Sequence, residues 1–162
     1  MKIVMALLAL VLAIGGCGNR EVLETVTDNY EAVAMASPRQ IVVELPGEAA
    51  LPAMESDSAR LYLCSDYEIA LQTLSAGDLD ATLRSVTGYG REDLTVMETM
   101  RSDRPCYEFA WSCMGETGDR VGQGILLDDG NYHYVMTVLW DAEGKGDSQI
   151  LWSQVFASFD IR

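Results

Sequence analysis

Basic side chains and histidine are scarce in this sequence. Its 162 residues include one histidine, and 11 lysines and arginines compare with 25 aspartates and glutamates, for a formal net charge of −14. A surface with this charge repels the phosphates of nucleic acids and of anionic lipids, so we expect no nucleic-acid partner. A single histidine also makes histidine-based metal sites and histidine-dependent catalysis poor candidates.

Sequence motifs of enzymes are missing as well. The chain has no His-Glu-x-x-His, Cys-x-x-Cys or Gly-x-Ser-x-Gly motif. Gly88-Tyr89-Gly90 and Gly122-Gln123-Gly124 lack the following lysine and serine or threonine of a phosphate-binding loop. We interpret the first as a helix stop and the second as a thinned strand that another backbone or a helix approaches closely. The sequence therefore predicts no catalytic, cofactor-binding or metal-binding residue, and a protein that is not an enzyme.

No apolar run reaches the length of about 18 residues that a membrane-spanning helix needs. The run from Ile3 to Ile14 follows Lys2 and leads into Ile14-Gly15-Gly16-Cys17. A positive residue, a short apolar run and small residues before a cleavage site are typical of a signal peptide. We therefore expect residues 1–16 to be a signal peptide. An ordinary secretory signal that happens to contain a cysteine is the alternative.

The end of this stretch resembles the bacterial lipobox, in which an aliphatic residue and two small residues precede a cysteine. The resemblance implies cleavage before Cys17 and a diacylglycerol thioether on its sulfur. One acyl chain holds a protein at a membrane only marginally, whereas two or three chains on one cysteine hold it stably. We expect a lipid-anchored protein on the extracytoplasmic face of the cell membrane, with the bilayer as its partner through acylated Cys17.

Residues 17–38 are predicted to be the lipidated cysteine and a tether. Polar residues and Pro38 interrupt any regular pattern in this segment. Val22, Val26 and Tyr30 have helical spacing, so a short helix is the alternative.

Residues 39–162 have the patterning of one globular domain. The chain is 49% apolar and 22% charged, a composition typical of a folded protein of one domain. Asp78 can cap a helix over 77–88 that ends at Gly88, and Asp147 can cap a final helix. β-branched and aromatic runs predict strands at 41–45, 60–64, 67–74, 94–100, 106–114, 121–127 and 132–140.

The turn Asp128-Asp129-Gly130-Asn131 predicts a tight hairpin, because Asp-Gly supplies the positive φ that such a turn requires. Neighbouring strands joined by hairpins pair antiparallel. The predicted fold class is α+β, with a single antiparallel β-sheet of about five to seven strands and the helices packed on it.

Three fragments of this domain carry a resemblance: Ile-Val-Val-Glu-Leu-Pro at 41–46, Gly-Ile-Leu-Leu-Asp-Asp-Gly-Asn-Tyr-His-Tyr at 124–134 and Trp-Ser-Gln-Val-Phe-Ala-Ser-Phe-Asp-Ile at 152–161. In this order they resemble the PsbP-like α/β sandwich. The resemblance implies that residues 39–162 form a PsbP-like domain, that Phe159 lies in its core, and that the domain serves binding or assembly. The sequence is also similar to uncharacterised lipoproteins of gut Clostridia, which implies a Gram-positive cell.

Three cysteines follow Cys17 in the chain: Cys64, Cys106 and Cys113. If 106–114 is one strand, Cys106 and Cys113 point to opposite faces and lie about 23 Å apart, at roughly 3.3 Å per residue. They cannot bond to each other without a bend. A disulfide from Cys64 to one of them and three buried reduced thiols are both open alternatives.

The other side chains that could carry chemistry have structural interpretations. His133 follows the predicted hairpin and is interpreted as a sheet-face residue. Asp128 and Asp129 belong to the turn and lack the alternating oxygens of a calcium loop. Asp78 and Asp80 open a helix, where carboxylates meet the positive end of its dipole. An aromatic set could line a ligand groove, although core packing explains most of it: Tyr62, Tyr107, Trp111, Tyr132, Tyr134 and Trp140.

These observations predict a tethered, non-enzymatic binding or assembly module of the cell envelope, with an envelope protein as its partner. The alternative is a lipoprotein that binds a small ligand or a cation in a groove between the sheet and the helices.

Overall fold

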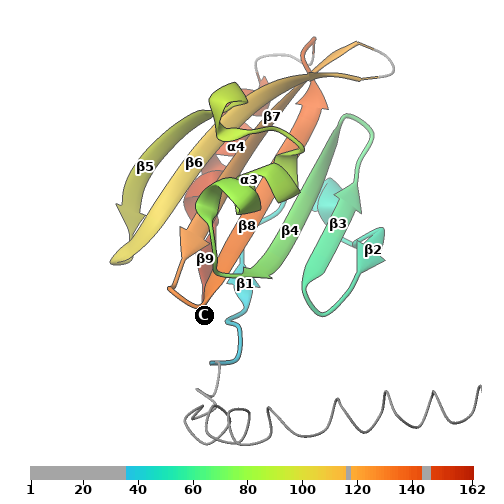
Figure 1. The fold of residues 1–162 in the computed structure, drawn as a ribbon. Helices are drawn as coiled ribbons and strands as arrows, with labels where there is room; N and C mark the ends of the chain where they lie inside the picture. Colours follow the sequence, from blue (N-terminus) through green and yellow to red (C-terminus); the bar gives the residue numbers. More distant parts are fainter. Residues whose placement is uncertain (1–35, 116–117, 144–146) are drawn as a thin grey trace, which may run out of the picture. The chain divides into compact units, whose positions relative to one another are not determined.

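The computed structural model describes residues 36–115, 118–143 and 147–162 (Figure 1). The predicted signal peptide at 1–16 and the predicted lipidation site Cys17 lie outside these residues. The tether predicted over 17–38 overlaps with them only at 36–38.

Seven antiparallel strands form the main sheet, in the order β2-β3-β4-β8-β7-β6-β5. β8 is the central strand, since three strands lie on each side of it. The strands are β2 (Met54–Glu55), β3 (Ala59–Leu63), β4 (Tyr67–Ser75), β5 (Thr95–Arg101), β6 (Arg104–Met114), β7 (Asp119–Asp128) and β8 (Tyr132–Asp141).

A second sheet corrects the prediction of a single one. β1 (Ile41–Val42) pairs with β9 (Asp160–Ile161) rather than with the main sheet. The predicted strand over 41–45 shrinks to two residues, because β9 is itself only two residues long and offers no further partners. Over the described residues the fold is therefore a sheet-dominated α+β fold with two sheets and two α-helices.

Helix α3 (Leu79–Thr87) forms as its end signals predicted. The Asp78 carboxylate accepts a hydrogen bond from the backbone N–H of Asp80 at 3.4 Å, which caps the first turn. Gly88 ends the helix at a φ of 81°, in the left-handed region that favours glycine. Leu83 is fully buried and fixes the helix against the sheet.

The two helices cover opposite faces of the main sheet (Figure 1). α3 packs over Phe109, Trp111 and the neighbouring strands, whereas α4 (Asp147–Ser158) covers the other face together with β1 and β9. Phe159 is fully buried on the α4 face, as the PsbP-like resemblance implied. Alternate residues of β8 therefore enter two separate cores.

Two hairpins show how local residues set the register. At the predicted turn after β7, the Asp128 carboxylate accepts a hydrogen bond from the N–H of Gly130 at 2.7 Å, and Gly130 has a φ of 88°. Between β5 and β6, Ser102 and Asp103 both adopt positive φ, at 50° and 60°. Glycine is absent there, so the sequence did not indicate that the two strands continue up to the turn.

Gly122 and Gly124 make room on β7 for neighbouring side chains, and not for the backbone or helix that we predicted. Aromatic rings, rather than another backbone or a helix, lie over them: Trp111 over Gly122 and Phe109 over Gly124. The two rings stack at a centroid separation of 5.9 Å. At these two positions β7 carries no side chain, and the rings of adjacent β6 fill the space.

The segment that enters the fold is fixed to the hairpin after β7. The Tyr134 hydroxyl donates to the Asp129 carboxylate at 2.9 Å and accepts the backbone N–H of Arg39 at 2.8 Å. Burial opposes ionisation of Asp129, but hydrogen bonds from the N–H groups of Tyr132 and Asn131, and from Tyr134, hold its pKa below the usual value. Asp129 thus has a structural role in the turn.

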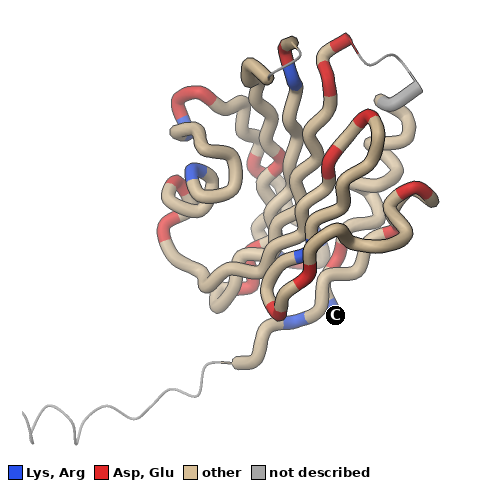
Figure 2. The backbone as a smooth tube through the Cα atoms, turned by 90° about the vertical axis from the view of Figure 1, so that its right-hand side faces the viewer, with Lys and Arg blue, Asp and Glu red and all other residues tan. Residues whose placement is uncertain are grey.

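Acidic residues are spread over the visible fold rather than concentrated at one place (Figure 2). Within the described residues, no group of three or more metal-ligating side chains comes together. The described helices also include none long and apolar enough to cross a membrane.

Candidate functional site

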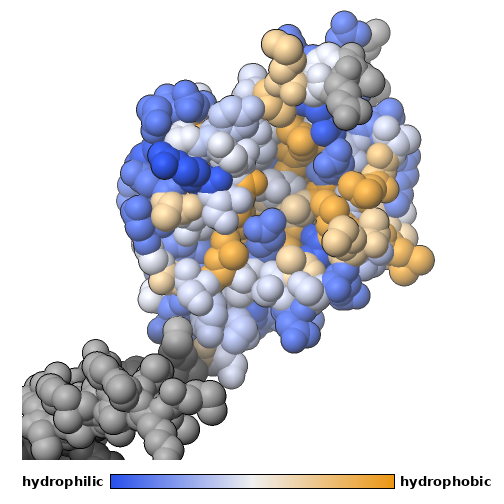
Figure 3. Space-filling view, turned by 45° about the vertical axis from the view of Figure 1, so that its right-hand side comes forward, coloured by the Kyte–Doolittle hydropathy of each residue, from blue (hydrophilic) through white to orange (hydrophobic). Residues whose placement is uncertain are grey.

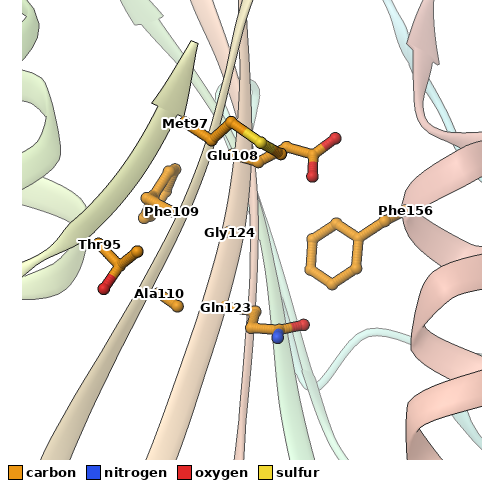
Figure 4. A pocket seen from close by; sticks show the side chains of 8 residues that line it. All are labelled: Thr95, Met97, Glu108, Phe109, Ala110, Gln123, Gly124 and Phe156. Carbon is orange, nitrogen blue, oxygen red and sulfur yellow. The ribbon is translucent and has the colours of Figure 1, made fainter. Parts of the chain in front are cut away.

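A cavity opens on the α4 face of the sheet, between that helix and the edge formed by β5, β6 and β7 (Figure 4). Its volume is about 260 Å³. The sheet carries a small residue where it faces the helix, since Ala110 has only one methyl group. The lining residues are Thr95, Met97, Glu108, Phe109, Ala110, Gln123, Gly124 and Phe156.

Two polar side chains converge on an aromatic ring inside this cavity. The carboxylate of Glu108 and the amide of Gln123 both extend from the sheet toward Phe156 of α4 (Figure 4). Glu108 is the only titratable side chain among the lining residues. A carboxylate, an amide oxygen and a ring face together suit a hydrogen-bond donor or an organic cation with an apolar body.

Arg101 of β5 holds the cavity walls in place. One guanidinium nitrogen, Nη1, donates to the backbone oxygens of Phe156 at 2.6 Å and Phe159 at 3.0 Å, which satisfies carbonyls at the end of α4. The other, Nη2, lies 3.7 Å from Oε1 of Glu108. The Glu108 side chain is 41% exposed, so this ion pair is solvent-screened and leaves the carboxylate open to a ligand.

A second groove lies on the α3 face, where the short helix leaves β3 and β4 uncovered. It has a volume of about 330 Å³ and includes Leu61, Glu68, Gln72, Val86 and Tyr89. Figure 3 shows hydrophobic side chains gathered in the middle and right of the visible surface, with a mainly hydrophilic region to the left. Its lining is a mixture of polar and apolar side chains.

His133 is part of a buried contact between β8 and α3. Its side chain is 2% exposed; Nδ1 lies 2.8 Å from the Thr82 hydroxyl and Nε2 lies 3.7 Å from the Asp128 carboxylate. A threonine, a histidine and an aspartate in line resemble a catalytic triad in composition. Thr82 is itself 7% exposed and lines none of the cavities described above, so a substrate has no access. The interpretation as a sheet-face residue therefore holds.

The structure separates the three cysteines that follow Cys17. Cys64 follows β3, whereas Cys106 and Cys113 lie in β6. β4, β8 and β7 intervene, so at about 4.8 Å per strand the separation is roughly 19 Å, too far for a disulfide. The disulfide alternative is wrong. Of the reduced thiols Cys106 is buried, but Cys64 and Cys113 are only partly so.

Iodoacetamide at neutral pH is expected to alkylate Cys64 and Cys113 before Cys106 in the native chain. The thiolate is the reactive form, and burial both shields Cys106 and raises the pKa of its thiol. Mass mapping after timed exposure measures the three rates, with the urea-unfolded chain as the control in which all three react. Equal rates in the native chain would contradict the assigned burial.

The predicted aromatic set is mainly core. Tyr62, Trp111 and Tyr134 are buried, and Tyr107, Tyr132 and Trp140 pack partly buried against the two cores. Sequence reasoning missed the cavity residues Glu108 and Gln123. The sequence marks Glu108 and Gln123 only weakly, since each is a polar residue within an otherwise apolar or glycine-rich strand. The helix that faces them is distant in sequence, so their convergence on it could not be predicted.

No protein-family model and no curated protein matches the sequence. Solved structures do. A protein from Bacteroides thetaiotaomicron is 9% identical with a TM-score of 0.51, over 75% of this chain and 45% of that one. A Pseudomonas aeruginosa protein of unknown function is 11% identical with a TM-score of 0.50, over 76% and 98%. Cyanobacterial PsbP from Synechocystis is 12% identical with a TM-score of 0.47, over 75% and 81%.

These likenesses concern the fold alone. The chain spans less than half of the Bacteroides protein. At identities of 9% and 11%, the first two matches share with this chain a sheet-dominated α+β architecture.

Proposed function

We propose that this protein is an extracytoplasmic lipoprotein, anchored in the cell membrane through acylated Cys17, whose PsbP-like head is a non-enzymatic binding or assembly module. One observation carries the proposal: Lys2, the apolar run from Ile3 to Ile14 and the small pair Gly15-Gly16 precede Cys17 in the order that a lipobox requires. Acyl chains on that cysteine supply the membrane affinity.

Two features of the described head fit the proposed binding module. Its one histidine is sequestered between β8 and α3, away from the two cavities described above. Hollows on both sheet faces offer surfaces for a partner. The PsbP-like assignment rests on the three sequence fragments together with the α+β architecture. An envelope protein is the proposed partner.

A second candidate is a lipoprotein that binds a small ligand or a cation. The convergence of Glu108 and Gln123 on Phe156 favours it, because these groups can hold a positively charged or hydrogen-bond-donating molecule. A thermal-shift screen with small amines, divalent ions and metabolites separates the candidates. A ligand at 100 times its dissociation constant stabilises the fold by about 2.7 kcal/mol, a clearly visible shift.

Replacing Cys17 with alanine is expected to abolish incorporation of radiolabelled palmitate and to leave the precursor uncleaved in a bacterial host. The thioether cannot form without the sulfur, and cleavage depends on it. Cys64→Ala is the matched control, since Cys64 lies in the head and should leave labelling and processing unchanged. Normal partitioning of Cys17→Ala into the detergent phase would contradict the proposal.

A further inference from the structure

The edge strand β5 presents an unused backbone edge beside the cavity. In the described part of the chain, β5 pairs with β6 on one side and with no strand on the other. It runs for seven residues without proline, whereas the opposite edge strand, β2, has only two residues. A long, regular and uncovered edge can accept an added strand from another chain.

The cavity lies where a strand added to β5 would place side chains. Thr95 and Met97 of β5 both line it, and Met97 is 53% exposed. Side chains of an added strand alternate between faces, so every second one would lie on the α4 face next to these two residues. A volume of about 260 Å³ is below the roughly 300–1,000 Å³ of pockets that enclose whole small ligands. It suits one long side chain.

The polar groups of the cavity identify that side chain. Glu108 supplies a carboxylate and Gln123 an amide oxygen, while the ring of Phe156 and the stem of Met97 supply apolar surface (Figure 4). An aliphatic stem ending in an ammonium or guanidinium group matches both parts. The net charge of −14 also favours approach of a basic segment.

We propose that β5 and this cavity form one recognition site for an extended peptide segment of a partner protein, with a lysine or arginine side chain inserted between Glu108 and Phe156. Backbone hydrogen bonds to the edge of β5 hold the segment, and the cavity selects the basic residue. The proposal deepens the binding role proposed above and rests on it.

Binding of a blocked peptide to the full chain in detergent tests this site. The probe is acetyl-Thr-Val-Lys-Val-Thr-amide, compared by calorimetry with the same peptide carrying norleucine in place of lysine. We expect the lysine peptide to bind at least tenfold more tightly, because norleucine keeps the stem and loses the charge. Glu108→Gln should remove this difference. Glu98→Gln, which neutralises a carboxylate on the opposite face of β5, should preserve it.

Two further arms test the strand addition and the size of the cavity. N-methylation of one alternate set of peptide amides should abolish binding, and methylation of the other set should be tolerated, as an antiparallel ladder requires. Ala110→Leu fills the floor of the cavity, so it should lower the affinity of the lysine peptide to that of the norleucine peptide.

The contrary results are equally definite. Equal affinity of the two peptides, equal tolerance of both methylated sets, or no binding would overturn the proposal. Binding of n-butylammonium as tight as that of the lysine peptide would also overturn it, in favour of a site for free amines. Failure here is separable from failure of the membrane anchor, because peptide binding in detergent does not depend on lipid at Cys17 and palmitate labelling does not depend on Glu108.

Discussion

Replacing Trp152 with alanine is expected to lower the free energy of unfolding by about 3–5 kcal/mol. Trp152 joins α4 to the sheet: it is 3% exposed, stacks on Trp140 at a centroid separation of 5.9 Å and meets Tyr67 edge-on at 4.8 Å. Truncation removes this ring from the larger core and leaves a cavity that the two partners cannot fill without moving.

Urea unfolding of the full chain, followed by circular dichroism, measures the effect. Ile150→Ala is the matched control in the same helix, because Ile150 is 69% exposed and its truncation should change stability by less than about 0.5 kcal/mol. Trp152→Phe should cost less than Trp152→Ala, since it keeps an aromatic ring and removes a buried N–H without a protein partner in the described chain. Equal losses for Trp152→Ala and Ile150→Ala would show that α4 is not docked through Trp152.

Gly124→Val has the next largest expected effect, a loss of about 3 kcal/mol at the upper end of overpacking costs. A Cβ at Gly124 would run into the ring of Phe109, which is buried and lies directly across the strand pair. Phe109 stacks on Trp111 and packs with Leu83 of α3, so the ring cannot move aside without disturbing that core. The cost is therefore steric and not conformational, because Gly124 has no positive φ.

Gly77→Val is the control for this substitution. A Cβ at Gly77 meets nothing within 4 Å, so we expect its stability to stay within about 0.5 kcal/mol of the parent. The double variant Gly124→Val, Phe109→Ala should be more stable than the sum of the two single losses predicts, since the clash is removed with the ring. Additive losses would indicate that the two residues do not touch.

Local signals gave the positions of several elements correctly. Asp78 and Gly88 bounded α3, Asp-Asp-Gly-Asn formed the hairpin after β7, and the β-branched and aromatic run at 132–140 formed β8. These features depend on interactions between residues close together in the chain, or on the two-residue period of a strand. Such information is present in the sequence without knowledge of distant partners.

The pairing of distant segments was harder to predict. Residues 41–45 read as a strand, but only the position of β9 at the far end of the chain decides that two of them pair and that they form a separate sheet. The cavity is similar: Glu108 and Phe156 are 48 residues apart, and their convergence follows from where α4 crosses the sheet. Hydrophobic periodicity places Phe156 on an apolar helix face without indicating which strands it meets.

The membrane anchor is the claim on which the proposed role depends, and the intact mass of the mature protein tests it most directly. Purified from bacterial membranes in detergent, the chain is expected to begin at Cys17 and to carry the added mass of a diacylglycerol group on that residue. A chain that retains residues 1–16, or one that begins at another residue without attached lipid, would contradict the account.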